Sequence, residues 1–298
     1  MSRLLLGANG QLGQHLRARA NDLATCARNC ADHACDLADQ SALVSLLDSL
    51  RPSVIVNAAA YTAVDDAETN GEAAYRLNRD LPAWLAAWCR DNDALLVHYS
   101  TDYVFSGQPG RPWREDDPVA PESVYGASKL AGEQAIISTD CRALILRTAW
   151  VYSALPGNFL SAILGRAARG QSLKVVSDQV GSPTWAGSLA DATLVLLERA
   201  AERVERPELM HVAGQGAMSW HKLALEAVQM AAGRGMINHE VDVEPISSDQ
   251  WPQKAKRPAW SVLDGRRYEQ WTGRPLPDAR AALAECLDQW RDVACSFP

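Results

Sequence analysis

The first 150 residues alternate short apolar runs with segments of helical spacing, and this alternation restricts the possible folds more than any other feature. Apolar runs of strand length lie at residues 3–6, 23–27, 53–57, 94–99 and 143–148. Segments with helical spacing lie between them, at residues 12–20, 41–50, 71–91 and 123–138. Strands and helices that alternate at this interval form a parallel sheet covered by helices on both faces. We therefore expect an α/β fold, a Rossmann-type doubly wound parallel sheet.

The pattern loosens after residue 150, where several prolines and glycines interrupt it. Helical spacing returns at residues 187–201, 218–232 and 278–293, and a strand-like run lies at 209–213. Residues 245–276 show no clear period. We expect residues 1–150 to form the main domain, with segments near 177–213 returning to it. Residues 151–298 are expected to form mainly a smaller C-terminal substrate-binding domain.

Charge and hydropathy exclude some classes of partner. The chain has 298 residues, a formal net charge of -7 and no apolar run long enough to span a bilayer. An acidic protein lacks the basic face of a nucleic-acid binder and fits poorly on an anionic membrane. The amino-terminal apolar run is too short for a signal peptide. We expect a cytoplasmic protein with no nucleic-acid or membrane partner.

The seven cysteines are an odd number in a large chain, which favours reduced thiols. Cys26, Cys30, His33 and Cys35 could be written as a metal quartet. Structural zinc sites usually pair their ligands in two separated knuckles, whereas these four candidates fall within ten residues. The sequence therefore predicts no metal at this cluster.

Three glycines occupy the turn between the first expected strand and the first expected helix. Gly7, Gly10 and Gly13 have the spacing Gly-x-x-Gly-x-x-Gly, not the commonest dinucleotide fingerprint. A tight turn, a backbone close to a pyrophosphate and a helix packed on a strand each require a missing Cβ atom. The phosphates would lie at the amino end of the helix that begins near Gly10. The alternative is a plain turn. We expect an NAD(P)-binding Rossmann domain.

The end of the second expected strand bears on which dinucleotide binds. Sites that prefer NAD usually place Asp or Glu there to bind the ribose. The segment Thr25–Asn29 has no acidic residue and one cation, Arg28. Arg28 is either a partner for the 2′-phosphate of NADP or a solvated loop residue. The sequence favours NADPH and leaves NADH possible.

Tyr125 and Lys129 open the helix expected at 123–138, four residues apart. This spacing places both side chains on one helix face, about 6 Å apart along the axis. A tyrosine hydroxyl has a pKa of about 10, and a neighbouring ammonium favours the phenolate. Tyr125 is thus a candidate proton donor to a carbonyl oxygen, although the Tyr-x-x-x-Lys pattern is common on helices.

A hydroxyl-bearing strand end supports this interpretation. Ser100 and Thr101 end the strand expected at 94–99, at the carboxyl edge where ligands bind in open α/β sheets. Glycine loop, strand-end hydroxyls and Tyr-x-x-x-Lys in this order rarely coincide by chance. The combination predicts a nicotinamide-dependent reductase.

These motifs resemble the extended short-chain dehydrogenase/reductases and, within them, the dTDP-4-dehydrorhamnose reductase family. The resemblance covers nearly the whole chain. It rests on Gly7–Gly13, Val54–Asp65, Asn78, Ser100–Gly107, Tyr125–Lys129, Arg147–Tyr152, Asp178–Thr184 and Arg257–Asp264.

The resemblance implies roles for individual residues. The glycine loop would contact the cofactor through Gly7, Gly10, Gln11 and Leu12. Asp36 and Leu37 would lie beside the adenine, and Tyr99 near the nicotinamide. The backbone beneath the cofactor would be that of Ala60, Tyr61 and Thr62. Thr101, Tyr125 and Lys129 resemble the catalytic triad, in which Thr101 bonds the substrate carbonyl and Lys129 also touches the nicotinamide ribose.

The same resemblance implies substrate contacts. Asp102 and Trp150 would hold the sugar, and Arg257 would meet the diphosphate. Trp150 is alternatively a core residue, and Arg257 a surface residue. Some relatives are thought to build an intersubunit magnesium site with a glutamate on the first helix. His15 stands at the corresponding position, so we expect no metal.

The implied reaction is reduction of the 4-keto group of dTDP-4-dehydro-6-deoxy-L-mannose to dTDP-L-rhamnose, for surface polysaccharide such as lipopolysaccharide. A 4,6-dehydratase carries Thr-Asp-Glu where this chain has Thr101, Asp102 and Tyr103, and tyrosine is a poor carbon base at neutral pH. A 4-epimerase or another sugar-nucleotide reductase stays open, as does a non-catalytic subunit like the regulatory subunit of methionine adenosyltransferase. The expected partners are a dTDP-linked sugar and, in a homodimer, a second copy of the chain.

Overall fold

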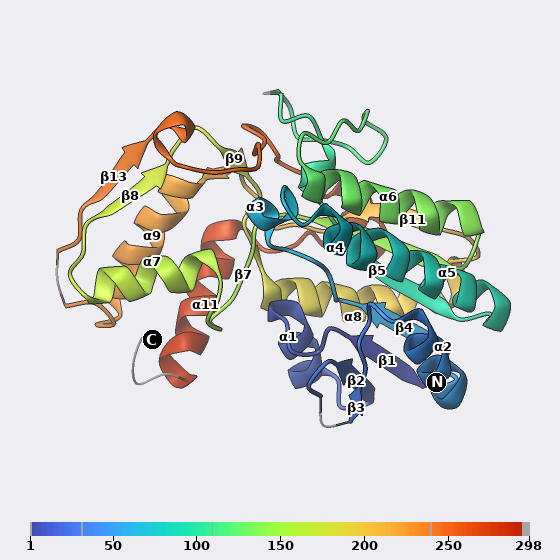
Figure 1. The fold of residues 1–298 in the computed structure, drawn as a ribbon. Helices are drawn as coiled ribbons and strands as arrows, with labels where there is room; N and C mark the ends of the chain where they lie inside the picture. The colour runs from blue at the N-terminus through green and yellow to red at the C-terminus, as the bar shows by residue number, and fades with distance from the viewer. Residues whose placement is uncertain (1, 31, 109, 239, 294–298) are drawn as a thin grey trace.

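A seven-stranded parallel sheet forms the centre of the computed structural model, which describes residues 2–30, 32–108, 110–238 and 240–293 (Figure 1). The strand order is β11-β6-β5-β4-β1-β2-β3, and every neighbouring pair is parallel. The strands are β1 (Arg3–Leu6), β2 (Leu23–Ala27), β3 (His33–Ala34), β4 (Val54–Asn57), β5 (Leu95–Thr101), β6 (Ala143–Thr148) and β11 (Glu208–His211). The chain reverses its direction of travel across the sheet between β1 and β4, which makes a topological switch point.

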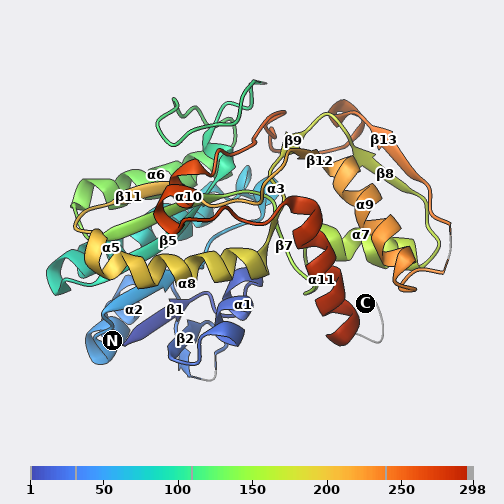
Figure 2. The same ribbon diagram turned by 180° about the vertical axis from the view of Figure 1, so that it is seen from behind.

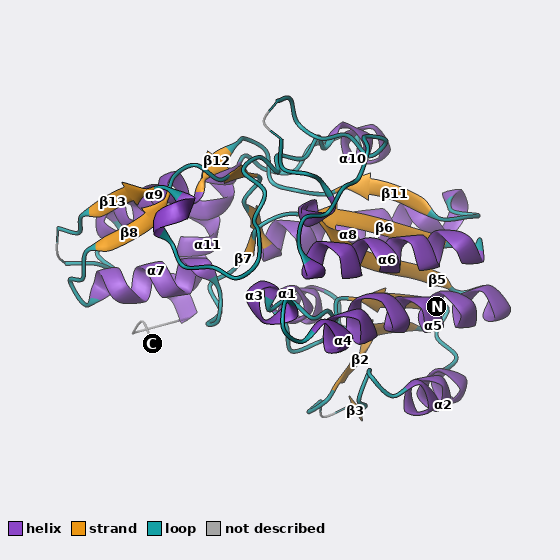
Figure 3. Ribbon diagram, turned by 45° about the horizontal axis from the view of Figure 1, so that its top comes forward, coloured by secondary structure: helices purple, strands orange, loops and turns teal. Residues whose placement is uncertain are grey.

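Helices cover both faces of this sheet. One face carries α1 (Gln11–Arg19), α8 (Ala186–Arg203) and α10 (Arg266–Thr272). The other carries α2 (Gln40–Leu50), α5 (Leu81–Asn92) and α6 (Val124–Thr139). Two short helices, α3 (Val64–Ala67) and α4 (Gly71–Tyr75), and a π-helical turn at Arg76–Asp80 lead into α5. Figure 3 distinguishes these helices from the strands by colour.

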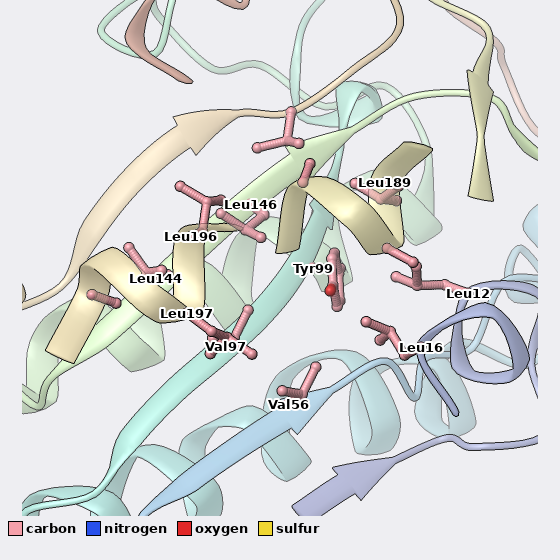
Figure 4. Packing of buried hydrophobic residues seen from close by; sticks show 14 of the residues in the cluster. Leu12, Leu16, Val56, Val97, Tyr99, Leu144, Leu146, Leu189, Leu196 and Leu197 are labelled. Atoms are coloured by element: carbon pink, nitrogen blue, oxygen red, sulfur yellow. The ribbon is translucent and has the colours of Figure 1, made fainter. Parts of the chain in front are cut away.

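Strand side chains alternate between the two faces because successive Cβ atoms point to opposite sides of a strand. Val56, Val97 and Tyr99 belong to the cluster packed against α1 and α8, whereas Ile55 and Leu96 belong to the cluster packed against α2, α5 and α6. Figure 4 shows the first cluster, where leucines of α1 and α8 surround Tyr99. Each fully buried leucine contributes about 2 kcal/mol.

A smaller unit lies beside the carboxyl edge of the sheet and has its own hydrophobic core (Figure 2). It consists of α7 (Phe159–Ala168), α9 (Trp220–Gly233), α11 (Ala279–Val293) and the parallel pair β8 (Leu173–Val176) and β13 (Val243–Ile246). Two short strand pairs complete it, β7 (Val151–Tyr152) with β10 (Thr184–Trp185) and β9 (Val180–Gly181) with β12 (Met218–Ser219).

The expected fold class is confirmed, and each helix and strand expected before residue 150 is present. The unexpected elements include α7, β8, β13, α10 and several short ones, namely α3, β3, β7, β9, β10 and β12. α10 lies within the segment that showed no period. After residue 150, α8 and β11 pack on the main sheet. The division of the chain at residue 150 stays a prediction.

Two expectations concern membranes and cysteines. No helix in the described ranges is long and apolar enough to cross a bilayer. Six of the seven cysteines lie in the described residues, and all six are free thiols. Cys295 lies outside them. Among the described residues, no three His, Cys, Asp or Glu side chains are grouped so that they could hold a metal ion.

Candidate active site

The glycine loop lies at the switch point, against the segment that follows β4. Gly7 has a φ of +78°, and a Cβ atom on it would lie 2.6 Å from the backbone nitrogen of Ala59. A Cβ atom on Gly13 would lie 2.2 Å from the carbonyl oxygen of Gly7. Gly10 is less crowded, with 3.4 Å to its nearest atom. Two of the three glycines are therefore required by packing, and Gly10 leaves an open approach to the helix.

The amino terminus of α1 fits an anion. Its N-cap residue is Gly10, no side chain caps the first turn, and that turn holds no acidic residue. Uncapped N–H groups and the positive end of the helix dipole favour a phosphate at this position. Leu12 turns into the hydrophobic core, so its contribution here is backbone. The loop and helix together fit a dinucleotide diphosphate.

The side chain of Gln11 hydrogen-bonds to residues of the smaller unit. Its Nε2 donates to the carbonyl oxygen of Pro156 at 2.7 Å, and its Oε1 accepts from Ser153 and from Asn158 Nδ2. Asn158 is also the N-cap of α7. Gln11 thus ties the first turn of α1 to the smaller unit, and only its backbone faces the phosphate position.

Arg28 and Asp36 lie together at the outer end of the loop. Arg28 Nη2 is 3.4 Å from Asp36 Oδ1, and both side chains are largely exposed. Leu37 is buried in the cluster on the α2 face. An exposed guanidinium at this end fits a 2′-phosphate, and an exposed pair costs little to separate.

Asn78 fixes the segment Ala60–Thr62 from the π-helical turn. Its Oδ1 accepts from Tyr61 N at 2.9 Å, and its Nδ2 donates to the Tyr61 carbonyl at 3.0 Å and to Ser128 Oγ at 3.0 Å. Ser128 lies on α6, between Tyr125 and Lys129. The expected cofactor platform is therefore bonded to the helix that carries the expected acid. Asn78 appeared in the motif list, but the sequence did not indicate this role.

Ser123 is the N-cap of α6, and its side chain accepts from Gly126 N at 3.1 Å. Lys129 is buried two turns later. Its Nζ donates to the Tyr99 carbonyl at 2.6 Å and lies 3.3 Å from His98 Nε2. Burial lowers the pKa of the Lys129 ammonium to about 8, and Glu133 on the same helix opposes that shift.

The expected acidification of Tyr125 is not what the structure shows. Burial raises the pKa of Tyr125 to about 12, the hydrogen-bonding Thr101 hydroxyl lowers it, and the Asp102 carboxylate raises it. Lys129 has no part in this shift because its amino group is directed to Tyr99 and His98. Tyr125 therefore keeps its proton near neutral pH, which is the form needed to donate one.

Thr101 is the hydroxyl beside Tyr125. Its Oγ1 donates to Asp102 Oδ1 at 3.0 Å and accepts from Tyr103 N at 3.2 Å. Asp102 is buried, so burial raises its pKa to about 6, while the Ser261 and Thr101 hydroxyls lower it. Asp102 contacts Thr101 in this structure, and its expected contact with a sugar stays a prediction.

Arg257, from the C-terminal part of the chain, lies near Tyr103 and Tyr125. Arg257 donates to Asp65 Oδ2 at 2.8 Å and to Gln253 Oε1 at 2.7 Å. Its guanidinium also hydrogen-bonds Tyr103, whose pKa is raised by burial and by Asp102. The rings of Tyr103 and Tyr125 meet edge to face at 5.5 Å. Arg257 therefore lies one side chain away from the expected acid.

Trp150 follows β6 with a left-handed φ of +49°. It stacks on Trp220, with ring centroids 3.5 Å apart, and Trp220 contacts Phe159. Gly181 makes room for it, because a Cβ there would lie 2.5 Å from the Trp150 ring. Trp150 is partly exposed and is held rigidly between the two units.

Tyr99 differs from its expected orientation. Its side chain is buried in the cluster between α1 and α8 (Figure 4), and its hydroxyl lies 2.7 Å from Thr193 Oγ1. Its contact within the site is its carbonyl, which binds Lys129. Direct contact with a nicotinamide stays a prediction.

The structure brings Thr101, Asp102, Tyr125, Lys129 and Arg257 into one neighbourhood, with Trp150 at the junction with the smaller unit. The sequence did not predict the contributions of several other residues, namely Asn57, Asp65, His98, Trp220 and Ser261. A histidine inside an otherwise apolar strand, Leu95–Tyr99, was the one signal that could have indicated His98.

Comparisons with known proteins agree with this geometry. Residues 1–292 match the family model described as RmlD substrate binding domain. The chain is 40% identical to a dTDP-4-dehydrorhamnose reductase of Burkholderia thailandensis, over 96% of this chain and 98% of that one. It is 39% identical to a probable dTDP-4,6-dihydroxy-2-methyloxan-3-one 4-ketoreductase of Streptomyces antibioticus, over 96% and 95%. A crystal structure of the Bacillus anthracis dTDP-4-dehydrorhamnose reductase in complex with NADP superposes with a TM-score of 0.87, at 28% identity over 96% and 98%.

Proposed function

The chain belongs to the RmlD substrate binding domain family, and from this membership we propose that it is a dTDP-4-dehydrorhamnose reductase. It is an NADPH-dependent oxidoreductase that reduces the 4-keto group of dTDP-4-dehydro-6-deoxy-L-mannose to dTDP-L-rhamnose. NADH is a possible second cofactor. The observation that carries the proposal is the contact of Tyr125 with Thr101, in a fold that also provides a helix terminus and a glycine loop that fit a dinucleotide diphosphate.

Bound NADPH supplies the hydride to the carbonyl carbon. Tyr125 then donates its phenolic proton to the carbonyl oxygen, and its raised pKa keeps that proton available near neutral pH. Thr101 lies beside the phenol, and its hydroxyl turns from Asp102 to donate to the carbonyl oxygen when the substrate binds. Lys129 holds the cofactor ribose and returns a proton to Tyr125.

The substrate contacts are also part of the proposal. Trp150 supports the sugar ring, since its partly exposed face is fixed by Trp220. Arg257 meets the diphosphate and exchanges part of its bond to Asp65 for the new anion. Asp102 accepts from Thr101 in the free protein, and it accepts from a sugar hydroxyl once Thr101 turns to the substrate carbonyl.

The dehydratase alternative lacks its base. Burial raises the pKa of Tyr103, so this phenol is a poor acceptor of a proton from carbon. An epimerase shares most of the other residues with a reductase. Net oxidation of NADPH separates the two, because an epimerase returns the hydride to its substrate.

We further propose that the product supplies rhamnose for surface polysaccharide, including lipopolysaccharide and O-antigen, that the enzyme works in the cytoplasm, and that it forms a homodimer. The resemblance over the whole chain supports the first point. Light scattering of the purified protein tests the last.

The direct test is NADPH oxidation that depends on the keto sugar, with identification of the alcohol formed. Tyr125→Phe removes the proton donor, and we expect kcat to fall by about 10²- to 10⁴-fold with NADPH affinity kept. Tyr268→Phe is the matched control, since Tyr268 is a buried phenol on α10, on the opposite face of the sheet. A wild-type rate in Tyr125→Phe would overturn the assignment of the acid.

A further inference from the structure

A buried polar chain runs beneath the expected acid and ends at Lys129. Asn57 on β4 and His98 on β5 are register partners, and both point toward α6. Asn57 is 1%, His98 0% and Lys129 2% exposed. Three polar side chains are thus enclosed at the centre of the molecule, where each hydrogen-bonding group needs a matched partner.

The contacts form a single line. The N–H of Ala59 donates to Asn57 Oδ1 at 3.2 Å. Asn57 Nδ2 lies 3.0 Å from His98 Nδ1, and His98 Nε2 lies 3.3 Å from Lys129 Nζ. Lys129 Nζ donates to the Tyr99 carbonyl at 2.6 Å.

The N–H of Ala59 fixes the direction of the other hydrogen bonds in this line. The backbone N–H of Ala59 can only donate, so the oxygen of the Asn57 amide faces it and the NH₂ group faces His98. A neutral imidazole has one donor and one acceptor nitrogen. Nδ1 must accept from Asn57, and Nε2 therefore carries the proton and faces Lys129.

This direction determines which form of Lys129 completes the line. An ammonium group has donors alone, so it would place an N–H against the N–H of His98 Nε2. An amine has a lone pair that accepts from Nε2 while one of its own hydrogens binds the Tyr99 carbonyl. Every group in the line is satisfied when Lys129 is an amine and mismatched when it is an ammonium.

We propose that Asn57 and His98 are positioning residues that set the proton affinity of Lys129: the Asn57 amide fixes the tautomer of His98, whose Nε2–H group favours the amine form of the lysine. The other titratable or charged groups near Lys129 are Tyr125 and Glu133 on α6, and Arg147 on β6, which pairs with Glu133 at 2.7 Å. That ion pair limits how far Glu133 can favour the ammonium. Burial also lowers the pKa of Lys129, and the proposed line of bonds acts in the same direction as burial.

The consequence for catalysis rests on the proposed function. An ordinary lysine holds its proton until about pH 10.4 and releases it slowly to a phenolate near neutrality. A lysine that exchanges its proton nearer the working pH transfers it more readily. Asn57 and His98 would thus make Lys129 a faster source of the proton that restores Tyr125 after each turnover, and would also set the pH above which reduction stops.

The closing experiment titrates Lys129 directly. The chain has five lysines, at 129, 174, 222, 254 and 256, and the other four are exposed. NMR titration of the full-length protein with ¹³C-labelled lysine side chains therefore follows one buried lysine and four exposed ones. We expect Lys129 to titrate well below the others. A Lys129 resonance that titrates with them overturns the proposal before any variant is made.

Asn57→Val tests the mechanism without adding a charge. It frees the imidazole to turn an acceptor toward Lys129, and we expect Lys129 to titrate about one pH unit higher, the size of one charge-assisted hydrogen bond. A burial effect alone predicts no change or a lower value. Asn57→Ser is the second variant if Asn57→Val does not fold, since its hydroxyl can still accept from Ala59 and rotates freely.

His98→Phe supplies the control. In a His98→Phe background, Asn57→Val should no longer move the Lys129 titration, because the amide acts through the imidazole. An equal shift in both backgrounds would overturn the proposal. In the active enzyme, Asn57→Val should move the alkaline limb of kcat upward with KM little changed. Because the titration needs no substrate, a protein that reduces no keto sugar would fail the proposed function while the Lys129 result stands by itself.

Discussion

The two sides of the candidate site are held by different means. On the cofactor side, backbone and buried side chains are fixed by contacts from neighbouring strands and helices, such as Asn78 with Tyr61 and His98 with Lys129. On the sugar side, Trp150 and Arg257 depend on partners more than sixty residues away, Trp220 and Asp65. Under the proposed function, the groups for hydride and proton transfer are held by the sheet, whereas those for sugar recognition come from separate segments that can change independently.

The largest expected effect is the loss of NADPH binding on the cofactor side. Gly13→Val puts side-chain atoms where backbone already lies, since even a Cβ would be 2.2 Å from the Gly7 carbonyl. We expect NADPH affinity to fall at least about 100-fold and the fold to lose about 3 kcal/mol. Fluorescence titration with NADPH and thermal unfolding measure the two. Gly265→Ala, whose new Cβ meets no atom within 4 Å, is the control, and unchanged NADPH binding in Gly13→Val would refute the packing argument.

A second change on the cofactor side, at Lys129, should have opposite effects on activity and on stability. Lys129→Met should reduce kcat by about 100-fold or more. The folded-state pKa of about 8 lies below the unfolded value, so the unfolded chain binds more protons between these pH values and wild-type stability rises with pH there. Below pH 8 the buried ammonium costs free energy, and Lys129→Met should be more stable by about 1–2 kcal/mol.

Denaturant unfolding at pH 7 and pH 10 measures this difference. The advantage of Lys129→Met should shrink at the higher pH, where the wild-type lysine is an amine. Lys174→Met is the control, because Lys174 is exposed. A variant less stable than wild type at both pH values would show that burial of Lys129 carries no such cost.

A third change tests whether the sugar side is separable. Trp220→Ala removes the ring that supports Trp150, and an aromatic pair contributes about 1 kcal/mol. We expect KM for the keto sugar to rise about five- to tenfold with NADPH affinity unchanged. Trp220→Phe should restore most of the loss. Trp251→Ala is the control, since Trp251 is exposed, and equal losses in sugar and NADPH binding would mean that the two sides are not independent.

The smallest expected effect concerns the choice of dinucleotide. Arg28→Ala removes an exposed cation, so we expect the Kd for NADPH to rise about fivefold to tenfold and the Kd for NADH to stay the same. High salt should also reduce the preference of the wild-type protein for NADPH over NADH. Equal weakening of both dinucleotides would assign Arg28 to a structural contact with Asp36.

The same contrast explains what the sequence could predict. Gly7–Gly13 and Tyr125–Lys129 are local patterns whose spacing has a physical meaning on a turn or a helix, so the fold class was accessible and Tyr125 could be named as a candidate acid. Trp220 and Asp65 carry no such pattern, because their role comes from pairing across the chain. The direction of the Lys129 amino group was also inaccessible, since it depends on a histidine and an asparagine in neighbouring strands. The predicted lowering of the Tyr125 pKa was wrong because burial, which the spacing of residues does not show, raises that pKa instead.

The placement of the Trp150 ring against Gly181 carries a consequence for how this fold can diversify. Any larger residue at 181 would collide with the indole, and any smaller ring at 150 would leave a void beside Trp220. A substitution at 150 or 181 alone would therefore disturb the packing of the Trp150 ring. A change of sugar specificity that involves this ring must alter both positions together. Laboratory evolution of sugar specificity would therefore succeed sooner with paired libraries at 150 and 181 than with single-site scanning.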